Sequence, residues 1–200
     1  MKETWDLIYK YVKSKTWKLG NSLESSGTKA ELAELRRGIG KMPGELPQLW
    51  GSFLLDLPAE LEKDVRDRAK PTYAEWAIYT ALTLYALHQQ GRSETVNSDD
   101  GALRLGGAVK KLVHSPDDEE RVMRRFSAMA TSSEPAELAN HLRSVVQLLK
   151  SENIKLDYAD LAKDLYFYQM PNQRNNVRLK WGRDYYREEN KDDIDKEGEK

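Results

Sequence analysis

The chain has 200 residues, a formal net charge of −1 and no cysteine. This length suits one domain or two small ones, and the lack of cysteine excludes disulfides and thiolate chemistry, which fits a reducing cytoplasm. Charged residues make up 32% of the chain, so much of the surface is expected to be helix rich in ion pairs. No apolar run approaches the roughly 20 residues that span a bilayer, so neither a membrane partner nor a signal peptide is predicted.

The near-neutral total hides an uneven distribution of charge. From Arg187 onward there are four Lys or Arg and seven Asp or Glu, a net −3, which leaves +2 for the rest of the chain. The body is therefore mildly basic. Ile194 is the one apolar residue of the last ten, and residues 188–200 are predicted to form a disordered acidic tail.

Helical periodicity dominates the first half of the chain. Residues 3–18 repeat apolar side chains at helical spacing, and Thr28 with Glu31 is typical of a capping box that opens a second helix. Two short helices are predicted after a connection that contains several Gly and Pro residues. Residues 71–90 form the most apolar helix, the expected spine of an N-terminal bundle over residues 1–90.

The second half is also helical. Residues 91–100 are polar and contain Gly, Ser and Asn, which predicts a linker or flexible loop. The remaining helices define a C-terminal bundle over residues 101–187; they are expected from Pro116, over 135–152, over 157–169 and over 174–187. Because there is almost no strand signal, the predicted fold class is all-α, with two small helical bundles.

The last predicted helix combines an apolar stripe with a basic one. Val177, Trp181 and Tyr185 fall at i, i+4 and i+8, so they are expected to dock into the core. Cations that include Lys180 and Arg183 form a neighbouring stripe that is expected to point outward. Five cations stand here against a single acid, so an anionic partner or surrounding carboxylates must offset their repulsion.

Little catalytic chemistry is indicated. His88, His114 and His141 stand singly, without the spacing of a metal site. The glycines do not follow a strand as a phosphate loop requires, and no nucleophile or paired carboxylate stands out. The sequence therefore predicts a protein that is not an enzyme and that holds no metal and no cofactor.

Cations recur in doublets, at Arg36 with Arg37, Lys110 with Lys111 and Arg124 with Arg125, before the basic run that ends the helical region. If the fold brings several of them to one side, they form a stripe that can follow a phosphate backbone without reading sequence. The alternative for each doublet is a solvated helix face whose cations pair with nearby acids.

Three segments resemble a known family. They are ELAELRRGIGKMPGELPQLW (residues 31–50), the RRF, LR and LDY helices within residues 120–169, and VRLKWGRDYY near the end of the last helix. In order and spacing they resemble CasB, the small subunit of the type I-E CRISPR surveillance complex Cascade. The resemblance covers most of the chain outside residues 91–100 and the tail.

The resemblance implies a non-catalytic, all-helical subunit of a crRNA-guided complex. Its implied partners are the other Cascade subunits, a second copy of itself, the crRNA within the complex, and the target and non-target DNA strands, which its basic faces would hold in the R-loop. The site residues that it implies are Arg36, Arg37, Arg124, Arg125, Arg143, Arg178, Lys180 and Arg183, to which the doublet pattern adds Lys110 and Lys111.

Two other functions stay open. A helical adaptor that binds only protein would pair its cations with acids, and a stand-alone DNA-binding regulator would need a helix-turn-helix spacing that is not convincing here. Salt dependence separates these functions. Phosphate contacts give log–log slopes near −0.9 per phosphate for duplex and −0.7 for single strands, whereas apolar contact gives little slope.

Overall fold

The computed structural model describes residues 3–62 and 70–187. Within these residues the protein is helical and contains no β-strand, which confirms the predicted all-α fold. The helices in chain order are α1 (Thr4–Gly20), α2 (Ser26–Arg37), η1 (Pro47–Leu49), α3 (Trp50–Phe53), α4 (Ala59–Glu62), α5 (Tyr73–Gln89), η2 (Gly101–Leu103), α6 (Leu105–Lys110), α7 (Pro116–Thr131), α8 (Pro135–Ser151), α9 (Tyr158–Tyr168) and α10 (Pro171–Tyr185).

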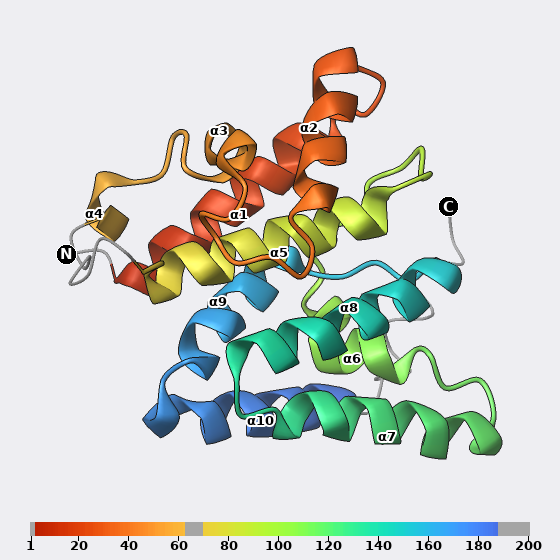
Figure 1. Cartoon of the computed structure of the whole chain (residues 1–200). Helices are drawn as coiled ribbons and strands as arrows, with labels where there is room; N and C mark the ends of the chain where they lie inside the picture. Colours follow the sequence, from red (N-terminus) through yellow and green to blue (C-terminus); the bar gives the residue numbers. More distant parts are fainter. Residues whose placement is uncertain (1–2, 63–69, 188–200) are drawn as a thin grey trace.

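Helix α5 runs through the middle of the molecule (Figure 1). It begins with a capping box, in which the Thr72 hydroxyl accepts a hydrogen bond from the Glu75 amide and the Glu75 carboxylate accepts one from the Thr72 amide. Nearly all of its side chains are buried, as expected for the spine, because it packs against α1 and α2 on one side and against α8 and α9 on the other.

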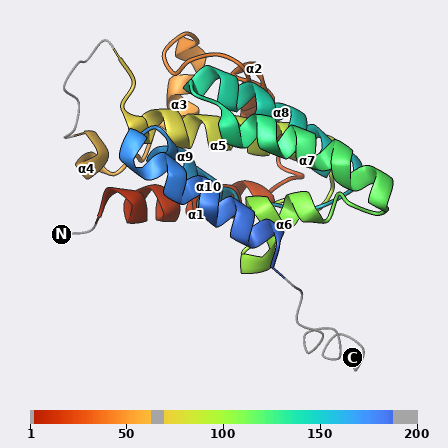
Figure 2. The ribbon, with the colours of Figure 1, turned by 90° about the horizontal axis from the view of Figure 1, so that it is seen from below.

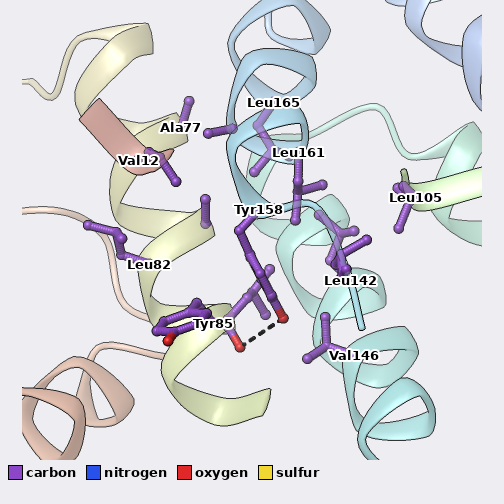
Figure 3. Close-up of a cluster of buried hydrophobic side chains, with 14 of the residues drawn as sticks. Val12, Ala77, Leu82, Tyr85, Leu105, Leu142, Val146, Tyr158, Leu161 and Leu165 are labelled. Carbon is purple, nitrogen blue, oxygen red and sulfur yellow. Dashed lines mark hydrogen bonds between the residues drawn. The ribbon is translucent and has the colours of Figure 1, made fainter. Parts of the chain in front are cut away.

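The buried apolar side chains of the two halves form one continuous cluster. Figure 3 shows Tyr158 of α9 lying between Tyr85 of α5 and the α8 side chains Leu142 and Val146. The division into an N-terminal and a C-terminal bundle stays a prediction, and its two halves share this core. The predicted acidic tail, residues 188–200, lies outside the described residues.

The segment predicted as a linker is attached to the second half by backbone hydrogen bonds. The Ser98 amide donates to the Leu156 carbonyl and the Leu156 amide donates to the Val96 carbonyl, each over 3.1 Å. An isolated parallel bridge joins Asn97 to Leu156. The loop therefore holds the start of α9 beside the end of α5.

The predicted capping box at Thr28 is wrong. Helix α2 begins at Ser26 after Ser25, and the Thr28 hydroxyl instead lies 2.7 Å from that of Ser22. Glu31 forms an ion pair with Lys15 of α1 at 2.6 Å. The capping box does not form because the side chains of Thr28 and Glu31 both bind partners outside their own helix turn.

Helix α10 packs against α6 and α9 and lies at the surface of the molecule (Figure 2). Gly106 makes the close approach to α6 possible, since a Cβ at this position would stand 2.1 Å from the Trp181 carbonyl oxygen. The predicted apolar stripe of Val177, Trp181 and Tyr185 is confirmed as buried. Among the described residues, no helix is long and apolar enough to cross a membrane.

Candidate nucleic-acid interface

The ten cations predicted from the sequence differ in where their charge is directed. Lys180 points inward, so its predicted outward orientation is wrong. Its ammonium lies 2.5 Å from an Asp160 oxygen and 2.7 Å from an Asp164 oxygen, and the Trp181 indole donates to the other Asp164 oxygen over 2.8 Å. The side chains of both aspartates are only 3% exposed. Lys180 is thus the counter-ion of buried Asp164 and shares buried Asp160 with Lys163, which lies 2.9 Å from its other oxygen.

This buried group shifts the pKa values of its members. Burial lowers the pKa of Lys180, but the two carboxylates outweigh burial and raise it above its ordinary value. Burial, followed by the nearby charge of Asp160, raises the pKa of Asp164 to about 6. The sequence carried a signal for this cluster, because Asp160 and Asp164 recur at i, i+4 on the helix face that carries Leu161 and Leu165.

The Arg178 side chain also makes contacts within the protein. Its guanidinium donates to the Ser132 carbonyl and to the Tyr168 hydroxyl, each over 3.3 Å, and stands over the Tyr168 ring. The Tyr168 hydroxyl in turn donates to the carbonyl of Ser132 over 2.8 Å. These contacts fix the connection between α7 and α8 onto α10.

Two further cations pair with exposed acids. Arg124 lies 2.8 Å from Glu120 on the outer face of α7, and Lys110 lies 3.3 Å from Glu119. Lys110 also stands over the Tyr185 ring, 5.1 Å from its centroid. Lys111 is exposed and has an interaction of its own. Exposed pairs of this kind contribute little stability, so their cations can exchange a carboxylate for a phosphate at small cost.

The other predicted cations form no ion pair with any acid in residues 3–62 and 70–187. Four are exposed at the surface and one is half-buried; they are Arg37, Arg125, Arg143, Arg183 and, half-buried, Arg36. An unpaired surface cation keeps its full charge for a partner outside the chain. These five are therefore the best candidates among the predicted contact residues.

The end of α2 is held in place by Gly38. The Tyr79 hydroxyl of α5 donates to the Gly38 carbonyl over 2.9 Å, and a Cβ on Gly38 would stand 2.5 Å from that hydroxyl. Only glycine lets the last turn of α2 approach α5 this closely. The glycine of the LRRG segment thus fixes the position of the two arginines before it.

Two further cations, Arg92 and Lys150, were not singled out by the sequence. Burial, then the charge of Arg92 and that of Arg36, lower the pKa of Lys150. Buried Gln89 holds the loop that presents Arg92, because its amide donates to the Arg92 carbonyl over 3.2 Å and to the Glu94 carbonyl over 2.8 Å. The Arg92 guanidinium donates to the Lys150 carbonyl.

Arg143 lies on the same side of α8 as Lys150. The two residues are seven positions apart, which is close to two helical turns and about 10 Å along the axis. We group these two with Arg36, Arg37 and Arg92 under the name α2–α8 basic face, since they come from the end of α2, the loop after α5, and α8. Arg92 and Lys150 were missed because they stand in a loop and at a helix end.

An all-α fold, with surface cations that form no ion pair with an acid of residues 3–62 and 70–187, defines the class as a helical protein with a basic surface. The comparisons place it more narrowly. Residues 31–186 match the family model described as CRISPR-associated protein Cse2. The chain therefore belongs to the CasB (Cse2) family, which supplies the small subunit of the type I-E CRISPR complex Cascade.

Solved structures of CasB proteins have the same fold. CasB from Thermobifida fusca is 32% identical, with a TM-score of 0.75 over 90% of this chain and 98% of that one. CasB from Thermus thermophilus is 23% identical, with a TM-score of 0.63 over 88% and 97%. M. ruber CasB is 24% identical, with a TM-score of 0.62 over 92% and 96%. No curated protein sequence matches the chain.

Proposed function

We propose that this chain is a non-catalytic Cascade subunit that binds the DNA backbone without sequence preference and so stabilises the R-loop during target recognition. The observation that carries the proposal is that Arg92 lies against Lys150, through the hydrogen bond from its guanidinium to the Lys150 carbonyl, and that the charge of Arg36 also acts on Lys150. None of the three forms an ion pair with an acid in the described part of the chain, although the charges of Arg92 and Arg36 both oppose the charge of Lys150. A phosphate group placed among them would remove that repulsion.

Contacts of this strength suit the task. Exchange of a DNA duplex for an RNA–DNA hybrid is nearly balanced in free energy, so a few backbone contacts from protein are enough to favour the open state. The α2–α8 basic face supplies charge from three elements, which are the end of α2, the loop after α5, and α8. Lys180 and Arg178 are assigned to the fold in this proposal, because their charged groups already have internal partners.

The test uses the crRNA-loaded complex reconstituted with full-length variants of this chain. R-loop lifetime is measured against salt for wild type and for the double variant Arg36→Gln/Arg143→Gln. The expected result is a shorter lifetime and a log–log salt slope reduced by about 0.7 to 0.9 for each phosphate that the variant no longer neutralises. The matched control is Lys29→Gln/Arg121→Gln, which removes the same charge from two exposed cations that pair with acids.

Two outcomes would contradict the proposal. An unchanged salt slope in the double variant would show that the α2–α8 basic face does not contact phosphate. A complex that fails to assemble with the double variant, but assembles with the control, would instead support the helical adaptor, in which these cations meet another protein.

A further inference from the structure

Helix α10 presents a second apolar group on its outer side. Leu179 is 53% exposed and Tyr186, the C-cap residue that follows the helix, is 69% exposed. The two are seven positions apart, with exposed Arg183 between them at i+4 from Leu179. This α10 outer stripe of Leu179, Arg183 and Tyr186 faces away from the buried stripe that docks the helix.

The ring of Tyr186 is held in place from one side. It packs edge-on against Tyr185, with ring centroids 4.9 Å apart at 75°, and Tyr185 stacks on Phe126 of α7 at 5.3 Å and 22°. Tyr185 is itself fully buried. An aromatic side chain fixed in this way loses little conformational freedom when a second flat group stacks on it.

The surroundings of Tyr186 favour an anionic partner. Arg183 and Arg187 flank it in sequence and are exposed, and Arg183 makes no ion pair with a described residue. Among the residues up to Arg187 that the structure describes, two acids lie near this end of α10, and cations act on both. Glu119 pairs with Lys110 at 3.3 Å, and Lys180, Arg104 and Arg187 act on Asp184.

We infer that the α10 outer stripe binds single-stranded nucleic acid, with Tyr186 stacking on an unpaired base and Arg183 and Arg187 contacting the adjacent phosphates. The inference rests on the proposed function and names its substrate more narrowly. Every base has an aromatic face, so stacking requires no particular sequence, but that face is available only where the base has no partner in a duplex. The stripe would therefore prefer unpaired strands, whereas contacts to phosphate alone do not distinguish them.

The experiment measures binding of the full-length chain to two probes at low salt, a twelve-nucleotide oligothymidine and a twelve-base-pair duplex. We expect Tyr186→Ala to weaken oligothymidine binding about tenfold, within the range measured for removal of one stacked base. Affinity for the duplex and the salt slope on both probes should stay unchanged. Tyr186→Trp should retain the affinity, and Tyr186→Leu, which keeps apolar area without an aromatic ring, should behave as Tyr186→Ala does. Arg183→Gln should weaken both probes and lower the slope.

Each other result overturns the inference. Equal weakening on both probes, no weakening with Tyr186→Ala, or full retention with Tyr186→Leu would remove the stacking role. A changed oligomeric state of Tyr186→Ala in gel filtration would show that the stripe meets a second copy of the chain. If wild type bound neither probe, the stacking assignment would fail, whereas the proposed function would still be decided by the reconstituted complex and its α2–α8 variants.

Discussion

Two ion pairs in this molecule have nearly the same length and opposite surroundings. Lys180 and Asp164 are 2.7 Å apart where α9 packs on α10, and Arg124 and Glu120 are 2.8 Å apart on α7. The side chain of Asp164 is 3% exposed, whereas those of Arg124 and Glu120 are 76% and 84% exposed. Distance therefore does not separate a cation that serves the fold from one that is available to a partner; burial does.

The difference arises from how far each charge has been removed from solvent. A buried carboxylate without its counter-ion would be desolvated and unpaired, so its cation cannot leave. An exposed pair exchanges partners with water, salt or phosphate at almost no cost. The cations on the α2–α8 basic face have no carboxylate to exchange, since they form no ion pair with any acid of the described chain.

The largest expected effect comes from breaking the buried pair. Lys180→Ala leaves buried Asp164 without its counter-ion, whereas Asp160 keeps Lys163 at 2.9 Å, and we expect a decrease of about 3 to 5 kcal/mol in the free energy of unfolding. Urea denaturation measures it. Arg183→Ala, on the same helix but exposed, should change stability by less than about 0.5 kcal/mol. Similar values for the two variants would refute the distinction between inward and outward cations on α10.

A second test uses pH. His88 is buried against the Tyr158 hydroxyl at 3.0 Å, and burial, then Arg92 and Lys150, lower its pKa from 6.5 to about 4. The unfolded chain therefore binds this proton more readily than the folded one, so stability is lost as pH falls from about 6.5 to 4, by about 3 kcal/mol. His88→Gln should remove this pH dependence.

Wild type must be compared with His88→Gln because protonation of Asp164 changes the stability with pH in the opposite direction. Its raised pKa, about 6, means that the folded state binds the proton more tightly, so its contribution is present at low pH and lost as pH rises from about 4 to 6. The difference between the two proteins cancels Asp164. Parallel curves of stability against pH would exclude His88 as the source.

A smaller effect is expected from the close backbone approach that places α10. Gly106→Ala puts a Cβ 2.1 Å from the Trp181 carbonyl oxygen, so we expect a decrease in stability of about 1 to 3 kcal/mol in thermal unfolding. Gly182→Ala on α10 is the matched control, because a Cβ there meets nothing within 4 Å. It should be neutral or stabilise the helix by up to about 1 kcal/mol. Equal destabilisation by both variants would show that the close packing of α6 on α10 does not depend on a glycine at position 106.

The smallest expected effect concerns the exposed pair. Arg124→Ala should change the free energy of unfolding by less than about 0.5 kcal/mol, since Arg124 and Glu120 are both solvated. Urea denaturation of Arg124→Ala and of Lys180→Ala compares the stability that each of these two ion pairs of nearly equal length contributes. A decrease above about 2 kcal/mol would show that exposure does not decide how much an ion pair contributes to the stability of this protein.

Much of the fold followed from the sequence. Helical periodicity placed α5, α7, α8, α9 and α10 within a few residues of their observed ends, and α7 and α9 have clear start signals in Ser115 and Asp157. Helix α10 begins three residues earlier than expected, at Pro171. The inward direction of Trp181 and Tyr185 followed from the same periodicity. The start of α2 did not, because Thr28 and Glu31 have partners outside their own helix.

The candidate site shows what the sequence by itself cannot decide. The sequence determined which cations exist and on which helix each one lies. Tertiary structure alone decided that Lys180 turns toward Asp160 and Asp164, that Arg92 lies against Lys150, and that Tyr186 remains exposed beside buried Tyr185. The physical reason is that helical spacing fixes the direction of a side chain only relative to its own axis. Whether that direction leads to a carboxylate, another cation or solvent depends on the neighbouring helix.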